Sequence, residues 1–124
     1  MAKITGLGGI FFKSRDPIAL SKWYAEHLGL PAQEWGGAMF TEDESRPGKT
    51  LWSPFKADTA YFGAGPQTFM INFRVDDLDS VLINLRRAGV DVDDKSEASE
   101  YGKFGWFTDP EGHRVELWEP PASA

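Results

Sequence analysis

A single glutamate in the last quarter of the chain is the residue best suited to acid–base or metal chemistry. Glu116 lies in the run Arg114-Val-Glu-Leu-Trp118, where apolar residues alternate with others as in a half-buried strand. In an apolar environment its pKa would be raised, and it could act as a general base. If Arg114 or Arg74 pairs with it, the carboxylate stays ionised and has a structural role. The sequence leaves both interpretations open.

Apart from Glu116, the sequence offers few residues for nucleophilic catalysis or metal binding. The 124 residues include no cysteine and two histidines, His27 and His113. Without cysteine there is no disulfide, no thiolate nucleophile and no thiolate-bound metal. No serine has a histidine and an aspartate at a spacing typical of nucleophilic catalysis. Metal binding therefore depends on carboxylates and on these two histidines.

The charge balance bears on possible partners. Nineteen acidic residues against 13 basic ones give a formal net charge of −6. A chain without a basic cluster lacks the surface that nucleic acids and anionic membranes require. The N-terminal stretch is too broken by glycine for a signal segment, and no apolar run is long enough to span a bilayer. We expect a cytoplasmic protein without nucleic-acid or membrane partners.

Two helices must position the strands that carry these residues. From Asp77 to Ala88, apolar residues recur every three or four positions, with Asp77 as N-cap and Gly89 as the stop. A second helix is predicted from about Pro17 to Leu28, on the same kinds of signal. Strand-like runs at residues 9–14 and 70–75 precede the two helices.

The two halves of the chain can be superimposed on each other. At an offset of 61 residues Ile10 meets Ile71 and Phe12 meets Phe73, and at an offset of 64 Trp52 meets Glu116. The chain is therefore predicted to contain two strand–helix–three-strand units, at about 5–56 and 67–120. Residues 56–68 join them, and residues 121–124 form a tail.

Three motifs resemble those of the vicinal oxygen chelate superfamily, which includes glyoxalase I, bleomycin resistance proteins and extradiol dioxygenases. They are Asp16-Pro…Trp23-Tyr24…His27-Leu-Gly29-Leu, Phe73-Arg-Val-Asp-Asp-Leu78 and the long run from Trp106 to Pro120. The resemblance covers about residues 5–120, a single domain. It implies an α+β fold in which two βαβββ modules form a curled mixed-sheet cup, commonly in a homodimer.

The resemblance also implies where a metal would bind. Metal-dependent members place His, Gln or Glu ligands at four repeat-related positions, which here hold Gly9, Trp52, Met70 and Glu116. Of these, only Glu116 can ligate a divalent ion. We therefore expect no cofactor, and a divalent metal held through Glu116 is the alternative.

Strand alternation predicts which side chains face the cup. In the strand at 70–75, Ile71, Phe73 and Val75 should face the helices. The predicted ligand-binding residues are Phe11, Lys13, Trp52, Met70, Asn72, Arg74, Arg114, Glu116 and Trp118. Three cations against one carboxylate would make the cup positive, which favours a small anionic or aromatic ligand. Alternatively, Lys13 and Arg74 reach solvent at their strand ends.

Three functions remain open from the sequence. The first is a small-molecule-binding protein, like bleomycin resistance proteins, without the usual metal site. The second is a metal-dependent lyase, isomerase or dioxygenase that uses Glu116, with further ligands from His113 or a partner subunit. The third is a non-catalytic structural module whose aromatic side chains fill the cup.

Overall fold

The computed structural model describes residues 2–28, 30–41, 49–109 and 112–122. Within these ranges the side chains at 23, 24, 27, 28 and 41 are outside the described part. The stripe predicted for the first helix from Trp23, Tyr24, His27 and Leu28 therefore lies outside the described residues.

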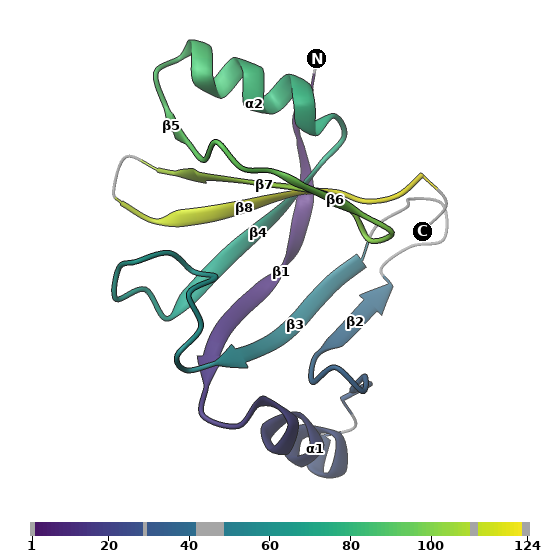
Figure 1. Cartoon of the computed structure of the whole chain (residues 1–124). Helices are drawn as coiled ribbons and strands as arrows, with labels where there is room; N and C mark the ends of the chain where they lie inside the picture. Colours follow the sequence, from purple (N-terminus) through teal and green to yellow (C-terminus); the bar gives the residue numbers. More distant parts are fainter. Residues whose placement is uncertain (1, 29, 42–48, 110–111, 123–124) are drawn as a thin grey trace.

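One mixed sheet and two helices make up the described chain (Figure 1). In chain order the elements are β1 (Ile4–Ser14), α1 (Pro17–Leu28), β2 (Ala38–Thr41), β3 (Lys49–Lys56), β4 (Phe69–Val75), α2 (Leu78–Arg87), β5 (Asp91–Val92), β6 (Glu97–Ser99), β7 (Gly102–Thr108) and β8 (Arg114–Glu119).

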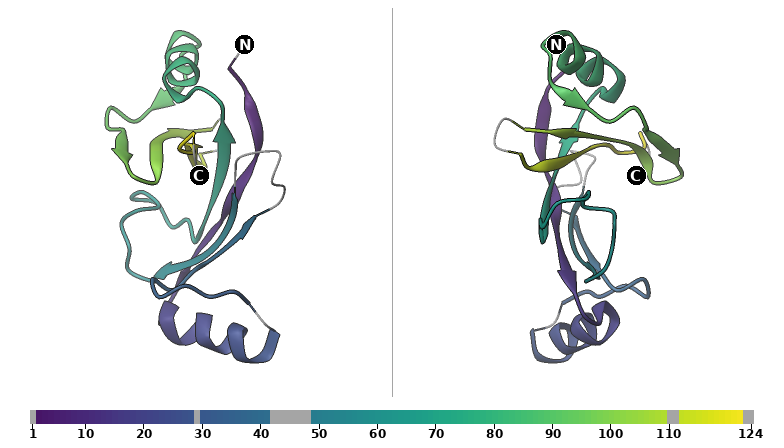
Figure 2. Two further views of the ribbon diagram at one scale, coloured as in Figure 1. Left: turned by 90° about the vertical axis from the view of Figure 1, so that its right-hand side faces the viewer. Right: turned by 60° about the vertical axis from the view of Figure 1, so that its left-hand side comes forward.

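The sheet has the internal symmetry that the repeat predicts. Its eight strands follow the order β2-β3-β1-β4-β8-β7-β5, and β6 also pairs with β7. Strands β1 and β4 pair antiparallel at the centre, and each has a parallel neighbour from its own half, β3 or β8. The sheet curls without closing into a barrel, and Figure 2 shows β7 and β8 running across the direction of β1. This is the α+β fold of two curled modules that the sequence predicts.

Both helices begin where the sequence predicts. The Asp77 carboxylate accepts a hydrogen bond from the Ser80 amide at 3.2 Å, and Asp16 accepts one from the Ala19 amide at 3.1 Å. These N-caps satisfy amides that the first helical turn leaves unpaired. Gly89, with φ of 80°, follows α2 in the left-handed conformation that glycine adopts readily.

The first module departs from the predicted three strands after its helix. In the described part of that module, only β2 and β3 follow α1, and an isolated bridge between Ala32 and Ala38 stands where another strand was expected. In the second module β5 and β6 both pair with β7. The two halves are therefore related in topology but differ at their outer edges.

Two apolar clusters lie on opposite faces of the sheet. On the helix face, Val75 and Leu117 pack against Leu78 and Leu82 of α2. On the concave face the cluster consists of Phe11, Phe62, Met70 and Trp106, and Phe62 comes from the joining segment. The joining segment therefore supplies part of the core beside the candidate site.

Phe73 and Val75 pack on the α2 side of the sheet as predicted, whereas Ile10 and Ile71 are not buried there. They are cross-strand neighbours with exposed fractions of 41% and 38%. The main helix contacts are of α1 with β3 and of α2 with β5, β7 and β8, so the helices cover the outer parts of the sheet. In the part of the chain that the structure describes, neither helix is long and apolar enough to cross a membrane.

Candidate functional site

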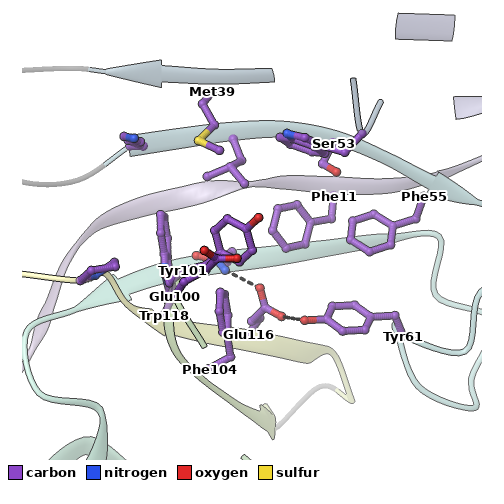
Figure 3. A pocket seen from close by; sticks show the side chains of 15 residues that line it. Phe11, Met39, Ser53, Phe55, Tyr61, Glu100, Tyr101, Phe104, Glu116 and Trp118 are labelled. Atoms are coloured by element: carbon purple, nitrogen blue, oxygen red, sulfur yellow. Dashed lines mark hydrogen bonds between the residues drawn. The ribbon is translucent and has the colours of Figure 1, made fainter. Parts of the chain in front are cut away.

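The concave face of the sheet contains a cavity of about 570 Å³. Its apolar walls come from several strands and from the segments beside them, and include Phe11, Met39, Leu51, Phe55, Phe104 and Trp118 (Figure 3). The Phe104 and Trp118 rings stack nearly parallel with centroids 6.1 Å apart. The polar side chains of the lining are Lys49, Ser53, Tyr61, Asn72, Glu100, Tyr101 and Glu116. Such a mixture of aromatic walls and few polar groups is typical of small-molecule sites.

The carboxyl group of Glu116, which lines this cavity, accepts three hydrogen bonds from other side chains. Its side chain is 1% exposed. The Tyr61 hydroxyl and the Trp106 indole nitrogen donate to Oε2 at 2.5 Å and 2.9 Å, and Asn72 Nδ2 donates to Oε1 at 2.6 Å. Three uncharged donors from three parts of the chain therefore fix the orientation of the carboxyl group.

Burial and hydrogen bonding shift the pKa of Glu116 in opposite directions. Desolvation raises the pKa of the carboxyl, while its three hydrogen bonds and the positive charge of Arg114 lower it by less. The pKa of Tyr61 is raised as well, by its own burial and then by the negative charge of Glu116. The phenol therefore keeps its proton and remains a donor to the carboxyl group.

Arg114 contacts residues next to the site and does not form the ion pair with Glu116 that the sequence suggested. Its Nη1 lies 2.7 Å from Asp93 Oδ2, and its Nε donates to the Tyr61 carbonyl at 3.1 Å. Its guanidinium carbon lies 5.3 Å from the centroid of the Trp106 ring. Arg114 thus positions two of the three donors to Glu116.

The expected positive cup is also corrected by the structure. The three expected cations, Lys13, Arg74 and Arg114, are not among the described residues that line the cavity. Lys13 Nζ lies 6.0 Å from the ring centroid of Phe62, and Arg74 is buried with Nη1 donating to the Lys49 carbonyl at 2.6 Å. The charged groups that do line the cavity are one lysine and two glutamates.

The placement of Trp52 on the cup face is wrong by one residue of register. Phe11 pairs with Ser53 and Ile10 with Trp52, so Leu51, Ser53 and Phe55 face the cavity. Trp52 faces the other way and packs edge-on against Phe12, with centroids 5.3 Å apart. A shift of one residue moves every side chain of a strand to the opposite face. The repeat offset in the last strand of each module is therefore 63, because Ser53 corresponds to Glu116 as Phe11 does to Asn72.

The four familial metal positions therefore hold Gly9, Ser53, Met70 and Glu116. These residues do not fit a metal centre of that kind, because Glu116 is the one strong ligand and its oxygens already accept three hydrogen bonds. No group of three or more histidine, aspartate or glutamate side chains within reach of one ion exists in the described ranges.

The structure brings together some of the predicted ligand-binding residues. Phe11, Asn72, Glu116 and Trp118 line the cavity, and Met70 lies on the same face, buried in the cluster beside it. Sequence reasoning did not assign Tyr61 or Trp106 to the site, because Tyr61 lies in the joining segment, 55 residues from Glu116. Only the fold shows that their polar atoms meet at Glu116.

Solved structures with a similar fold show which class of protein this chain resembles. Methylmalonyl-CoA epimerase from Streptomyces coelicolor is 21% identical, covers 97% of this chain and 100% of its own, and superimposes with a TM-score of 0.74. The epimerase from Mycobacterium tuberculosis is 19% identical over 97% and 91% of the two chains, with a TM-score of 0.65. The 2,2',3-trihydroxybiphenyl 1,2-dioxygenase from Sphingomonas wittichii is 20% identical over 97% and 42%, with a TM-score of 0.56. These structures share the vicinal oxygen chelate fold.

Residues 9–118 match the glyoxalase-like domain. The chain belongs to this glyoxalase-like family of the vicinal oxygen chelate superfamily. Comparison with the curated proteins gives no significant match. The family assignment therefore stands on the domain match, with the solved structures supporting the fold.

The raised pKa of Glu116 predicts a specific dependence of stability on pH. The folded chain holds this proton more tightly than the unfolded chain, whose carboxyl has the ordinary pKa of 4.5. As the pH rises above that value the unfolded chain ionises first, so this contribution to the free energy of unfolding falls until the pH passes the raised pKa. Urea unfolding of the wild type and of Glu116→Gln, from about pH 4 to about pH 8, should show the wild type losing stability relative to the variant. A stability difference that is constant or grows with pH would contradict this.

Proposed function

We propose that the protein binds a small molecule with an aromatic or otherwise apolar body in the concave cavity, without a metal at the familial position. The observation that carries this proposal is the cavity of about 570 Å³ with aromatic walls and one oriented carboxyl group at Glu116. Its size lies in the range typical of ligand pockets, about 300–1,000 Å³.

The cavity also distinguishes this function from the structural module considered above. In such a module the aromatic side chains would fill the cup. Instead, Phe104 and Trp118 stack on each other along one wall, and Phe55 stacks on Tyr61 with centroids 5.3 Å apart. The rings thus pack against their neighbours and leave the central volume open.

The aromatic part of the predicted ligand has more support than the anionic part. The cations that were expected to attract an anion are held outside the lining, by Asp93 for Arg114 and by the Lys49 carbonyl for Arg74. We therefore retain an aromatic or apolar ligand body as the proposal.

Fluorescence offers a direct test of ligand binding. Titration with a panel of aromatic acids, amines and neutral compounds should quench tryptophan emission saturably for at least one member. That member should also raise the melting temperature, because a ligand at 100 times its Kd stabilises by about 2.7 kcal/mol. Trp118→Phe should lose most of the quenching, whereas Trp52→Phe, altered on the opposite face, should keep it. A panel that moves neither emission nor melting temperature would refute the proposal.

An enzyme of the same superfamily is the second candidate. Of the three neighbours described above, two are methylmalonyl-CoA epimerases and one is a trihydroxybiphenyl dioxygenase by name. Among the described residues that line the cavity, the buried Glu116 carboxyl has a raised pKa, which suits a group that accepts a proton. Near one equivalent of a divalent metal per chain, lost in Glu116→Ala, would favour a metal-dependent lyase, isomerase or dioxygenase over simple binding.

We also propose a homodimer, as is common in the fold family. Half-exposed apolar side chains at the sheet centre, Ile10 and Ile71, provide a surface that a second copy could cover. Light scattering of the purified chain would give the mass directly, and a monomer at about 10 μM would contradict the proposal.

A further inference from the structure

The hydrogen bonds of Glu116 leave room for one more donor. An ionised carboxylate has about four lone-pair sites, two on each oxygen. Oε2 accepts from Tyr61 and Trp106, whereas Oε1 accepts from Asn72 alone among the described contacts. Figure 3 shows the carboxyl between Phe104 and Tyr61, facing Phe11 and Phe55 on the other side of the cavity. A ligand group in this space can therefore reach the carboxyl group.

The surroundings of Glu116 favour positive charge in that space. The faces of aromatic rings are electron-rich and attract ammonium groups, most strongly where water is excluded. Phe11, Phe55 and Phe104 present rings to the cavity, and their neighbour Trp118 extends this wall. An aromatic lining around a single buried carboxylate is suited to an organic cation.

The other charged groups do not compete for this position. Arg114 is engaged by Asp93 at 2.7 Å and does not line the cavity. Lys49 does line it, but it lies on β3, which β1 and β4 separate from the β8 strand of Glu116 in the sheet. Glu100, the third charged side chain of the lining, is an exposed acidic residue before β7. No cation of the described lining therefore stands next to Glu116.

We propose that the ligand carries a basic nitrogen, protonated when bound, which donates a hydrogen bond to Oε1 of Glu116 while its apolar body lies against the aromatic walls. This inference rests on the proposed function, because it names the class of molecule that the cavity takes. A carboxylate or phosphate at the same point would face Glu116 without a compensating charge, so anions bind weakly there.

Three probes of nearly equal shape separate charge from hydrophobic fit. 2-Phenylethylamine carries an ammonium group, 2-phenylethanol a neutral donor and 3-phenylpropionate an anion. Calorimetric titration of the full chain at about pH 7.5, where the amine is protonated and the acid ionised, should give a Kd for the amine at least about tenfold lower than for the alcohol. The anion should bind more weakly than both.

Charge-matched variants locate the effect. Glu116→Gln should remove the preference for the amine over the alcohol. Asp91→Asn, which makes the same charge change at an exposed position on β5, should leave the preference intact. Circular dichroism checks that both variants fold. If Glu116→Gln does not fold, the three probes on the wild type still decide the sign of the preferred charge.

The possible failures are distinguishable. If the alcohol binds as well as the amine, or if Glu116→Gln keeps the preference, the inference is wrong while the proposed function stands. Tightest binding of 3-phenylpropionate also overturns it and restores the anionic ligand expected from the sequence. If none of the three probes binds, the inference is again wrong, and the broader fluorescence panel decides separately whether the cavity binds ligands.

Discussion

Replacing Phe62 by alanine should lower the free energy of unfolding by about 3–5 kcal/mol. Phe62 is 1% exposed and packs in the concave cluster with Phe11, Met70 and Trp106. Truncation leaves a cavity that the surrounding strands can close only in part. Urea unfolding followed by circular dichroism measures the change.

Phe69→Ala is the matched control for this variant. Phe69 is 57% exposed and should cost less than about 1 kcal/mol, although its ring stacks on Phe12. A similar loss in the two variants would contradict the view that Phe62 anchors the joining segment. Because Tyr61 is the next residue, Phe62→Ala should also weaken ligand binding more than Phe69→Ala does.

Gly8→Ala should disrupt the hydrogen bond between Asn72 and Glu116 in the cavity and lower the free energy of unfolding by about 1–3 kcal/mol. A Cβ atom at Gly8 would lie 1.7 Å from Asn72 Oδ1 and 2.7 Å from its Cγ. The Asn72 side chain would have to move, which would break its 2.6 Å hydrogen bond to Glu116. Asn72 is 1% exposed, so its amide has little room to move away from the added methyl group.

Two further variants test this explanation. Gly65→Ala is the control, since its Cβ meets nothing within 4 Å and its φ is not positive, and it should change stability by less than about 0.5 kcal/mol. Combining Gly8→Ala with Asn72→Ala removes the clash, so the double variant should be more stable than the sum of the single effects predicts. Strict additivity would show that Gly8 acts through some other contact.

The joining segment has a larger role in this chain than a connection between modules. Phe62 fills the concave cluster, and Tyr61 donates to Glu116 at 2.5 Å. The Tyr61 carbonyl accepts from Arg114, so the segment is tied to β8 by side-chain and backbone groups. At the position where metal-dependent relatives hold an ion, the carboxyl group is oriented by uncharged donors.

Local signals in the sequence were sufficient for much of the fold. The N-caps Asp16 and Asp77, the stop at Gly89 and the apolar spacing depend on residues within a few positions of each other, and the structure confirms both helices. The alignment of the two halves set Ile10 against Ile71, and the structure adds that these equivalent residues are cross-strand neighbours on β1 and β4.

Strand register and contacts between distant residues could not be predicted from local sequence signals. An alignment of the two halves that is wrong by one residue placed Trp52 in the cup, because side chains alternate faces at every position of a strand. Charged side chains were assigned by face alone, whereas Arg114 turns towards Asp93, 21 residues away, and leaves the cavity. Neither error is visible in local patterns.

Glu116 illustrates the division between sequence and tertiary structure. The resemblance to the superfamily implies four ligand positions, and residue type makes Glu116 the one strong ligand among them. Its environment depends on Tyr61 and Asn72, which lie 55 and 44 residues away, and on a cavity wall built from both modules. Burial and hydrogen bonding are properties of atoms brought together by folding, so only the tertiary structure could show that the carboxyl is held by neutral donors in an aromatic cavity.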